Sequence, residues 1–302
     1  DCSTVNTGVP QGSILGPIIF ALYCADIVNS IKHCKYHIYA DDIQIYITFK
    51  PSEASVAIQK LNDDLSYITQ WSESHNLVLN PDKTKYIILG TKKQINLIGS
   101  LNPIIQIKGK NIERVKEVRN LGLLIDEELR FEKHTINTVR SCFYRLKVLY
   151  RIRDVLSKDM RIKLCDSLVL SKLNYADAVI GPRLHARSKN LIQRVQNASL
   201  RYCFQIPPRA HVSPYLNTAR MIKMEYRRQL HLATLLFGVI QNKAPLYLYS
   251  KLSWAKESNK TYPTRASSYM LSVPLHRSAA FRGSFRYAAT KCWNNLPPPL
   301  RI

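Results

Sequence analysis

Asp41 and Asp42 are adjacent carboxylates that could carry chemistry. The flanking runs, 36–40 and 43–47, are rich in β-branched and aromatic residues, which predicts a β-hairpin over 36–47 with the pair at its tip. Two neighbouring carboxylates repel each other, and a Mg²⁺ ion, which prefers hard oxygen ligands, would relieve that repulsion. Aspartate is also a common turn residue, so such a pair taken alone is more often structural.

A loop about thirty residues earlier could bring backbone close to a ligand. It reads Gly8-Val9-Pro10-Gln11-Gly12-Ser13, and its glycines permit a close approach to a nucleotide and a template base. Ser13 could cap the apolar helix expected over 18–31. The same pattern also suits an ordinary strand-to-helix loop.

The positive charge of the chain is concentrated in its second half. The net charge is +23, from 44 Lys and Arg against 21 Asp and Glu. Residues 1–139 hold 15 of each sign, whereas residues 140–302 hold 29 basic and 6 acidic residues. A field of one sign favours a polyanionic partner, most often nucleic acid. A merely soluble basic domain is the plainer alternative, and a membrane-surface role is disfavoured because the charge is not gathered on one amphipathic helix.

Cysteine usage and hydropathy bear on the compartment. The seven cysteines form no CxxC pair and no zinc-ligand spacing. Scattered thiols without a signal peptide indicate a reduced, nuclear or cytoplasmic protein. We expect no membrane contact, because no apolar run reaches the roughly 18–20 residues that a spanning helix requires.

The sequence pattern over residues 52–130 predicts a mixture of helix and short strands. Ser52 is expected to cap a helix whose apolar positions recur at helical spacing, at Val56, Leu61, Leu65, Ile68 and Trp71. A turn at Asn80-Pro81-Asp82 should lead into a strand over 86–89. Residues 94–130 are expected to form short strands with glycine breaks.

From about residue 132 the pattern is helical. Arg140, Tyr144, Lys147 and Arg151 fall on one stripe, with Phe143, Leu146 and Tyr150 on the other side. Further helices are expected over 158–177, 188–204 and 220–242. The last of these predicts a core face made of Ile222, Tyr226, Leu230, Ala233, Phe237 and Ile240.

Four segments in order, GVPQGSILGPIIFALY, YADDIQIY, NPDKTKYIIL and NLGLLID, closely resemble successive motifs of reverse transcriptases. The form resembles that of non-LTR (LINE, jockey-like) retrotransposons. Residues 192–204, 225–242 and 288–297 also look like the C-terminal region of these elements. The resemblance therefore extends over nearly the whole chain and implies an RNA-directed DNA polymerase, a nucleotidyltransferase.

The resemblance implies roles for individual residues. Asp41 and Asp42 match two metal-binding aspartates of the palm, which help hold two Mg²⁺ ions. Lys83 matches a basic residue that could neutralise or protonate pyrophosphate, although it could also be a solvated lysine. The remaining matches are the nucleotide and template loop (Gln11, Gly12, Ser13), the primer grip (Leu121, Gly122) and a thumb whose Arg140, Lys147 and Arg151 contact the nucleic-acid backbone.

The resemblance also implies what the chain lacks. In these enzymes the third metal-binding aspartate and the fingers precede the GVPQG loop, and an endonuclease domain lies further upstream. We therefore expect the chain to be a C-terminal fragment that is inactive alone. RNA template, DNA primer or target, and deoxynucleoside triphosphates would be the partners of the parent polypeptide.

The expected fold is an α/β palm remnant followed by a mainly α-helical basic thumb and C-terminal region. The predicted boundaries are 1–130 for the partial palm, 131–215 for the thumb-like region and 216–302 for a C-terminal helical region of unknown role. A non-catalytic nucleic-acid-binding relic of a decayed retroelement is the alternative. A protein-interaction module is a third hypothesis, which the charge asymmetry argues against.

Overall fold

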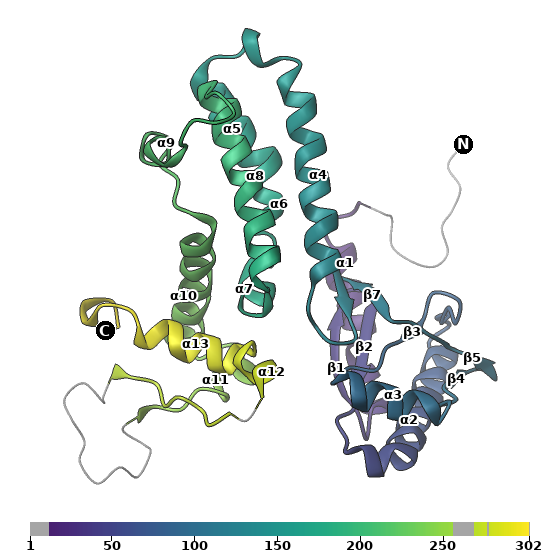
Figure 1. Ribbon diagram of the computed structural model, residues 1–302. Helices are drawn as coiled ribbons and strands as arrows, with labels where there is room; N and C mark the ends of the chain where they lie inside the picture. Colours follow the sequence, from purple (N-terminus) through teal and green to yellow (C-terminus); the bar gives the residue numbers. More distant parts are fainter. Residues whose placement is uncertain (1–11, 256–268, 277, 302) are drawn as a thin grey trace, which may run out of the picture. The chain divides into compact units, whose positions relative to one another are not determined.

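The computed structural model describes residues 12–255, 269–276 and 278–301 and divides the chain into two units, residues 1–118 and 119–302 (Figure 1). The first unit mixes helices with short strands, and the second is almost entirely helical. This agrees with the coarse prediction of an α/β part followed by a helical part. No helix in the described ranges is long and apolar enough to cross a bilayer.

Over its described residues the first unit has three α-helices, α1 (Gly16–Tyr23), α2 (Ala54–Ser74) and α3 (Lys92–Ser100), and two 3₁₀ turns, η1 (Ala25–Ser30) and η2 (Pro51–Glu53). Its strands pair in twos. β1 (Lys35–Tyr39) is antiparallel to β2 (Asp42–Tyr46), β3 (Lys85–Tyr86) is parallel to β6 (Glu113–Arg114), and β4 (Gln106–Ile107) is antiparallel to β5 (Lys110–Asn111).

Helix α2 organises the core of this unit. Its apolar positions recur at helical spacing, and Leu65, Ile68 and Trp71 are buried. Ile68 and Trp71 pack on Ile27 of η1, and Leu65 packs on the β4–β5 region through Ile107. The predicted helix is confirmed, except that Val56 is exposed.

Several local predictions for the first unit were wrong. The apolar helix expected over 18–31 ends at Tyr23, and the 3₁₀ turn η1 follows it. Ser52 does not cap α2, because it lies inside η2 and the helix begins after Glu53. The strand predicted over 86–89 is reduced to Lys85–Tyr86. Part of the stretch expected to be strands forms α3, because Thr91 accepts a hydrogen bond from the Gln94 amide while the Gln94 side chain accepts one from the Thr91 amide. This is a capping box, and the T-x-x-Q pattern was its overlooked signal.

The second unit begins with a hairpin, β7 (Glu117–Asn120) and β8 (Leu123–Asp126), of which β7 crosses the boundary between the units. Its longer helices are α4 (Glu132–Tyr150), α5 (Lys158–Cys165), α8 (Ala186–Phe204), α10 (Met224–Asn242) and α13 (Phe285–Asn294). The shorter ones are η3 (Arg153–Val155), the π-turn η4 (Asp166–Leu170), α6 (Ser171–Asn174), α7 (Asp177–Ile180), η5 (Gly181–Arg183), α9 (Ser213–Thr218), α11 (Leu246–Tyr249), α12 (Ala279–Arg282) and η8 (Pro298–Leu300).

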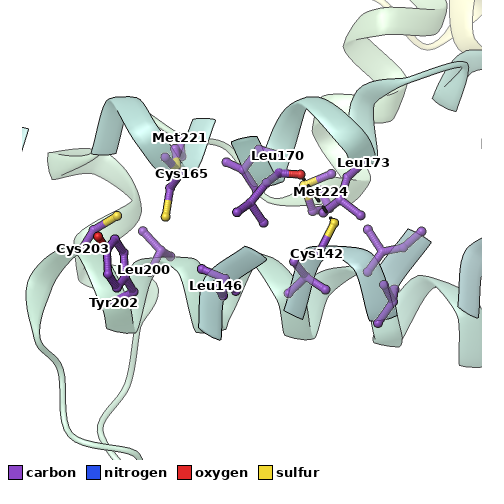
Figure 2. Packing of buried hydrophobic residues seen from close by; sticks show 14 of the residues in the cluster. Cys142, Leu146, Cys165, Leu170, Leu173, Leu200, Tyr202, Cys203, Met221 and Met224 are labelled. Atoms are coloured by element: carbon purple, nitrogen blue, oxygen red, sulfur yellow. Dashed lines mark hydrogen bonds between the residues drawn. The ribbon is translucent and has the colours of Figure 1, made fainter. Parts of the chain in front are cut away.

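One apolar cluster holds α4, α5, α6 and α8 together. Cys142 and Leu146 of α4 face Leu170 and Leu173, and the Cys142 thiol donates a hydrogen bond to the Val169 carbonyl (Figure 2). The buried positions of α4 recur every three or four residues, as a helix with one buried face requires. The predicted helix starting near 132 is confirmed, with Leu146 buried but Phe143 and Tyr150 partly exposed.

The predicted core face of α10 was wrong. Tyr226 and Leu230 are 57% and 54% exposed, and Ile222 and Phe237 are exposed as well. The buried face consists instead of Met224, Arg228, Leu232, Leu236 and Val239. The helical period was right but the phase was not, because this helix is apolar on more than one side and a buried arginine interrupts its true core stripe.

Candidate functional site

The Asp41–Asp42 pair lies at the tip of a regular two-stranded hairpin. Tyr39 pairs with Asp42 and Ile38 with Ile43, so Ala40 and Asp41 form a two-residue turn with Ala40 in the left-handed region at φ 53°. This confirms the predicted hairpin. Both carboxylates are exposed, where a cation could reach them. Across the described ranges no group of three His, Cys, Asp or Glu residues could hold a metal, so the pair supplies only part of a ligand set.

Asp64 of α2 fixes the segment that leads into β1. Its fully buried carboxylate accepts hydrogen bonds from three successive backbone amides, those of Lys32 (3.0 Å), His33 (3.0 Å) and Cys34 (2.7 Å). Burial by itself would raise the pKa of the Asp64 carboxyl, but these donors outweigh burial and hold the pKa below its ordinary value. Burial and the contact with Asp64 raise the pKa of the Cys34 thiol to about 12. The hairpin is thereby anchored to α2.

A second link joins η1 to the end of α2. The Trp71 indole Nε1 donates to Asp26 Oδ1 at 2.9 Å, and His75 Nε2 lies 3.3 Å from Asp26 Oδ2. The Trp71 and His75 rings stack at 4.4 Å. Asp64 lies 30–32 residues from the amides that it binds, and Asp26 lies 45 residues from Trp71. Local sequence patterns gave no sign of these links because the partners are so far apart in the sequence.

Part of the predicted nucleotide loop can be located. Gly12 has φ 89°, a conformation that favours glycine, and Ser13 Oγ accepts a hydrogen bond from the amide of Gly16, the first residue of α1. The N-cap position of α1 is Leu15 and not Ser13, so the predicted cap was wrong, although Ser13 still contacts the first turn of the helix. Gln11 lies outside the described residues.

Lys83 follows a side-chain-supported turn. Asn80 Oδ1 accepts hydrogen bonds from the backbone amides of Asp82 (3.0 Å) and Lys83 (3.1 Å). The Lys83 side chain is exposed. Leu79, just before the turn, packs against the same two buried clusters as Ile45 of β2. The turn and the β1–β2 hairpin therefore pack against the same two buried clusters, although Lys83 itself belongs to neither.

Leu121 and Gly122 form the turn between β7 and β8. Both have positive φ, 44° and 81°, as the tight hairpin turn that suits strand twist requires. The hairpin is fastened to α4, since the Leu124 amide donates to His134 Nδ1 at 3.3 Å and the Phe131 amide donates to Asp126 at 2.6 Å. Burial and the nearby Arg119 charge lower the pKa of His134, which keeps that nitrogen free to accept.

The predicted basic stripe of α4 is exposed. Arg140, Lys147 and Arg151 lie on the face opposite the buried cluster, and Tyr144 between them is 70% exposed. Within the described part of the chain none of the three basic side chains has an ion-pair partner. The stripe can therefore offer its full charge to an anionic ligand.

Sequence comparisons identify the proteins to which the chain is similar. Residues 2–125 match the family described as "Reverse transcriptase (RNA-dependent DNA polymerase)", so this segment carries reverse transcriptase sequence. The chain is homologous, over part of its length, to polymerases of non-LTR retrotransposons. It is 26% identical over 201 residues to "RNA-directed DNA polymerase from mobile element jockey" of Drosophila funebris. The aligned segment covers 63% of this chain and 21% of that protein.

Two further relatives come from Drosophila melanogaster. The probable RNA-directed DNA polymerase from transposon BS is 25% identical, over 48% of this chain and 16% of its own length. The probable RNA-directed DNA polymerase from transposon X-element is 25% identical, over 64% and 21%. The chain thus spans about a fifth of the length of these relatives. No solved structure matches it.

Proposed function

We propose that this chain is the part of an RNA-directed DNA polymerase that carries the catalytic hairpin and the element that holds the primer–template duplex. The observation that carries the proposal is the exposed Asp41–Asp42 pair on a hairpin tip, within the segment that matches the reverse transcriptase family. The names of the three relatives, each of which specifies an RNA-directed DNA polymerase, support the reaction class.

The carboxylates of Asp41 and Asp42 would hold Mg²⁺, because hard oxygen ligands suit that ion. The described residues bring only these two carboxylates together, so further ligands would have to come from elsewhere in a longer polypeptide or from the nucleotide. When bound, the metal would activate the primer hydroxyl and stabilise the leaving pyrophosphate.

The other site residues would position the substrates. Gln11, Gly12 and Ser13 would lie against the incoming nucleotide and template base, and Lys83 would neutralise the pyrophosphate. The turn Leu121–Gly122 would hold the primer strand. The Lys83 side chain is exposed, which suits contact with an anionic ligand. Gly12 and Gly122 have positive φ and carry no side chain, which suits a close approach of backbone to a substrate.

We further propose a palm part over 1–130, a thumb-like region over 131–215 and a C-terminal helical region over 216–302. The partners would be an RNA template, a DNA primer or target and deoxynucleoside triphosphates, with fingers and an endonuclease in the parent polypeptide. The rise in basic charge beyond residue 139 supports a duplex-holding role for the later regions.

Primer extension tests the proposal. A longer polypeptide that adds the upstream polymerase segment to this chain is supplied with an RNA template, a DNA primer, Mg²⁺ and all four deoxynucleotides. Template-dependent extension by the longer polypeptide is the expected result. If it binds the template but adds no nucleotide, the chain is better explained as a non-catalytic nucleic-acid-binding relic, a second candidate that the exposed stripe of α4 favours.

The α4 stripe should govern duplex binding by the chain itself. Replacing both Arg140 and Lys147 with glutamate should weaken binding to a primer–template duplex about tenfold or more and should lower the magnitude of the salt slope by about two, one for each lost phosphate contact. Fluorescence anisotropy over a range of salt concentrations measures both quantities.

The control for this measurement is the double variant Lys243→Glu and Lys251→Glu, an equal total charge change at two exposed lysines that follow α10. It should have a clearly smaller effect. An equal loss in the two double variants would mean that the protein binds through its overall charge and not through α4.

A further inference from the structure

Tyr175, in the connection between α6 and α7, reaches back 54 residues to the β7–β8 turn. Its hydroxyl donates a hydrogen bond to the Leu121 carbonyl. A Cβ built at Gly122 would lie 3.4 Å from both Cε1 and the hydroxyl of Tyr175, so the ring also lies against that glycine. One side chain therefore contacts both residues of the turn.

The turn needs such support because Leu121 has φ 44°. A left-handed conformation costs a residue with a Cβ roughly 1–2 kcal/mol, and leucine has no polar side chain with which to stabilise it locally. Gly122, at φ 81°, carries no such cost. The hydroxyl of Tyr175 supplies a hydrogen bond to the strained residue from a distant helix connection.

Tyr175 is itself held firmly. Its neighbours Leu173 and Ile180 are buried in the main cluster of the second unit. Asp177, two residues later and 3% exposed, lies 2.7 Å from His231 Nδ1 of α10. The connection that carries Tyr175 is therefore fastened on both sides, and its hydroxyl is presented from a fixed position.

We propose that Tyr175 is a positioning residue that sets the Leu121–Gly122 turn for the primer strand, which rests on the function proposed above. By holding the Leu121 carbonyl, Tyr175 fixes the plane of the Leu121–Gly122 peptide. In a planar trans peptide the N–H points opposite to the C=O, so the Gly122 amide is aimed away from Tyr175. That amide is the donor that would meet a phosphate of the primer strand.

The test uses the full chain and two duplexes that differ only at one end, an RNA–DNA hybrid with a recessed DNA 3′ end and its blunt counterpart. The unchanged chain should prefer the recessed end. Tyr175→Phe removes only the hydroxyl and should reduce that preference about fivefold, the effect of one hydrogen bond, while the thermal unfolding midpoint falls by only about 2–4 °C. Tyr215→Phe, on α9 and in contact with Phe204, is the matched control and should not change it.

A second variant separates positioning from direct contact. Leu121→Gly relieves the left-handed strain, so in that background Tyr175→Phe should reduce the preference less than twofold. A full fivefold loss in both backgrounds would overturn the positioning role, as would an unchanged preference in Tyr175→Phe. If the unchanged chain binds both duplexes equally, the primer-grip assignment fails and this inference fails with it.

Discussion

Replacing Asp41 with asparagine should lower nucleotide addition by the longer polypeptide about a thousandfold. Stabilisation of the transferring phosphoryl group by a bound metal is worth several kcal/mol, and each 1.4 kcal/mol is about a factor of ten in rate. Asparagine keeps the size of the side chain but removes the charge that would hold the ion. Single-turnover primer extension, with template binding measured in parallel, checks the result.

The substitution should leave the hairpin folded. Asp41 is exposed, it occupies the turn and not the paired strands, and within the described part of the chain its side chain has no hydrogen-bond or ion-pair partner. A loss of activity can therefore be assigned to the missing carboxylate. Asp63→Asn, the same change on α2 where the carboxylate contacts only Gln59 in the described structure, is the control and should retain activity. Full activity in Asp41→Asn would rule out the proposed catalytic role of this carboxylate.

Much of the fold was predictable because its signals are local. Alternating β-branched and aromatic residues around Asp41–Asp42 predicted the hairpin, and the apolar spacing of α2 and α4 predicted those helices. The face of α10 was not predictable in the same way. Its core stripe contains Arg228, which lies against Gly181 and close to Asp177, and only the tertiary structure reveals these contacts.

The residues of the candidate site also differ in whether a local sequence pattern reveals them. Asp41, Asp42 and Gly12 could be singled out from their residue types and spacing, and Leu121 and Gly122 from the resemblance of their motif, and their roles stay predictions. Asp64 and Tyr175 were missed because each acts on backbone groups far away in the sequence, at 30–32 and 54 positions respectively. An aspartate inside a helix and a tyrosine in a loop have no distinctive local pattern. Residues that hold a site in place are therefore harder to predict than residues that would touch the substrate.

Asp64 is the residue whose loss should most affect the first unit. Asp64→Asn keeps the shape of the side chain, but its amide group cannot accept three backbone hydrogen bonds and brings its own donors towards the amides of Lys32, His33 and Cys34. Leaving such donors unsatisfied in a buried place should destabilise the unit by about 3 kcal/mol. Hydrogen exchange followed by mass spectrometry reports on each unit separately, and exchange should accelerate over residues 27–47 but not in α4 or α8.

The same contact should make the first unit sensitive to acid. A carboxyl whose pKa is lower in the folded state adds stability above its unfolded pKa, about 3.9, and this stability is lost as the pH falls through the folded value. Protection of the segment before β1 should therefore decrease below about pH 4 in the unchanged chain. Asp64→Asn should start lower and show a flatter pH dependence, whereas Asp63→Asn should behave like the unchanged chain. Equal acid sensitivity in both variants would mean that another carboxyl anchors the β1–β2 hairpin, and Asp26, which accepts a hydrogen bond from Trp71, would be the next candidate.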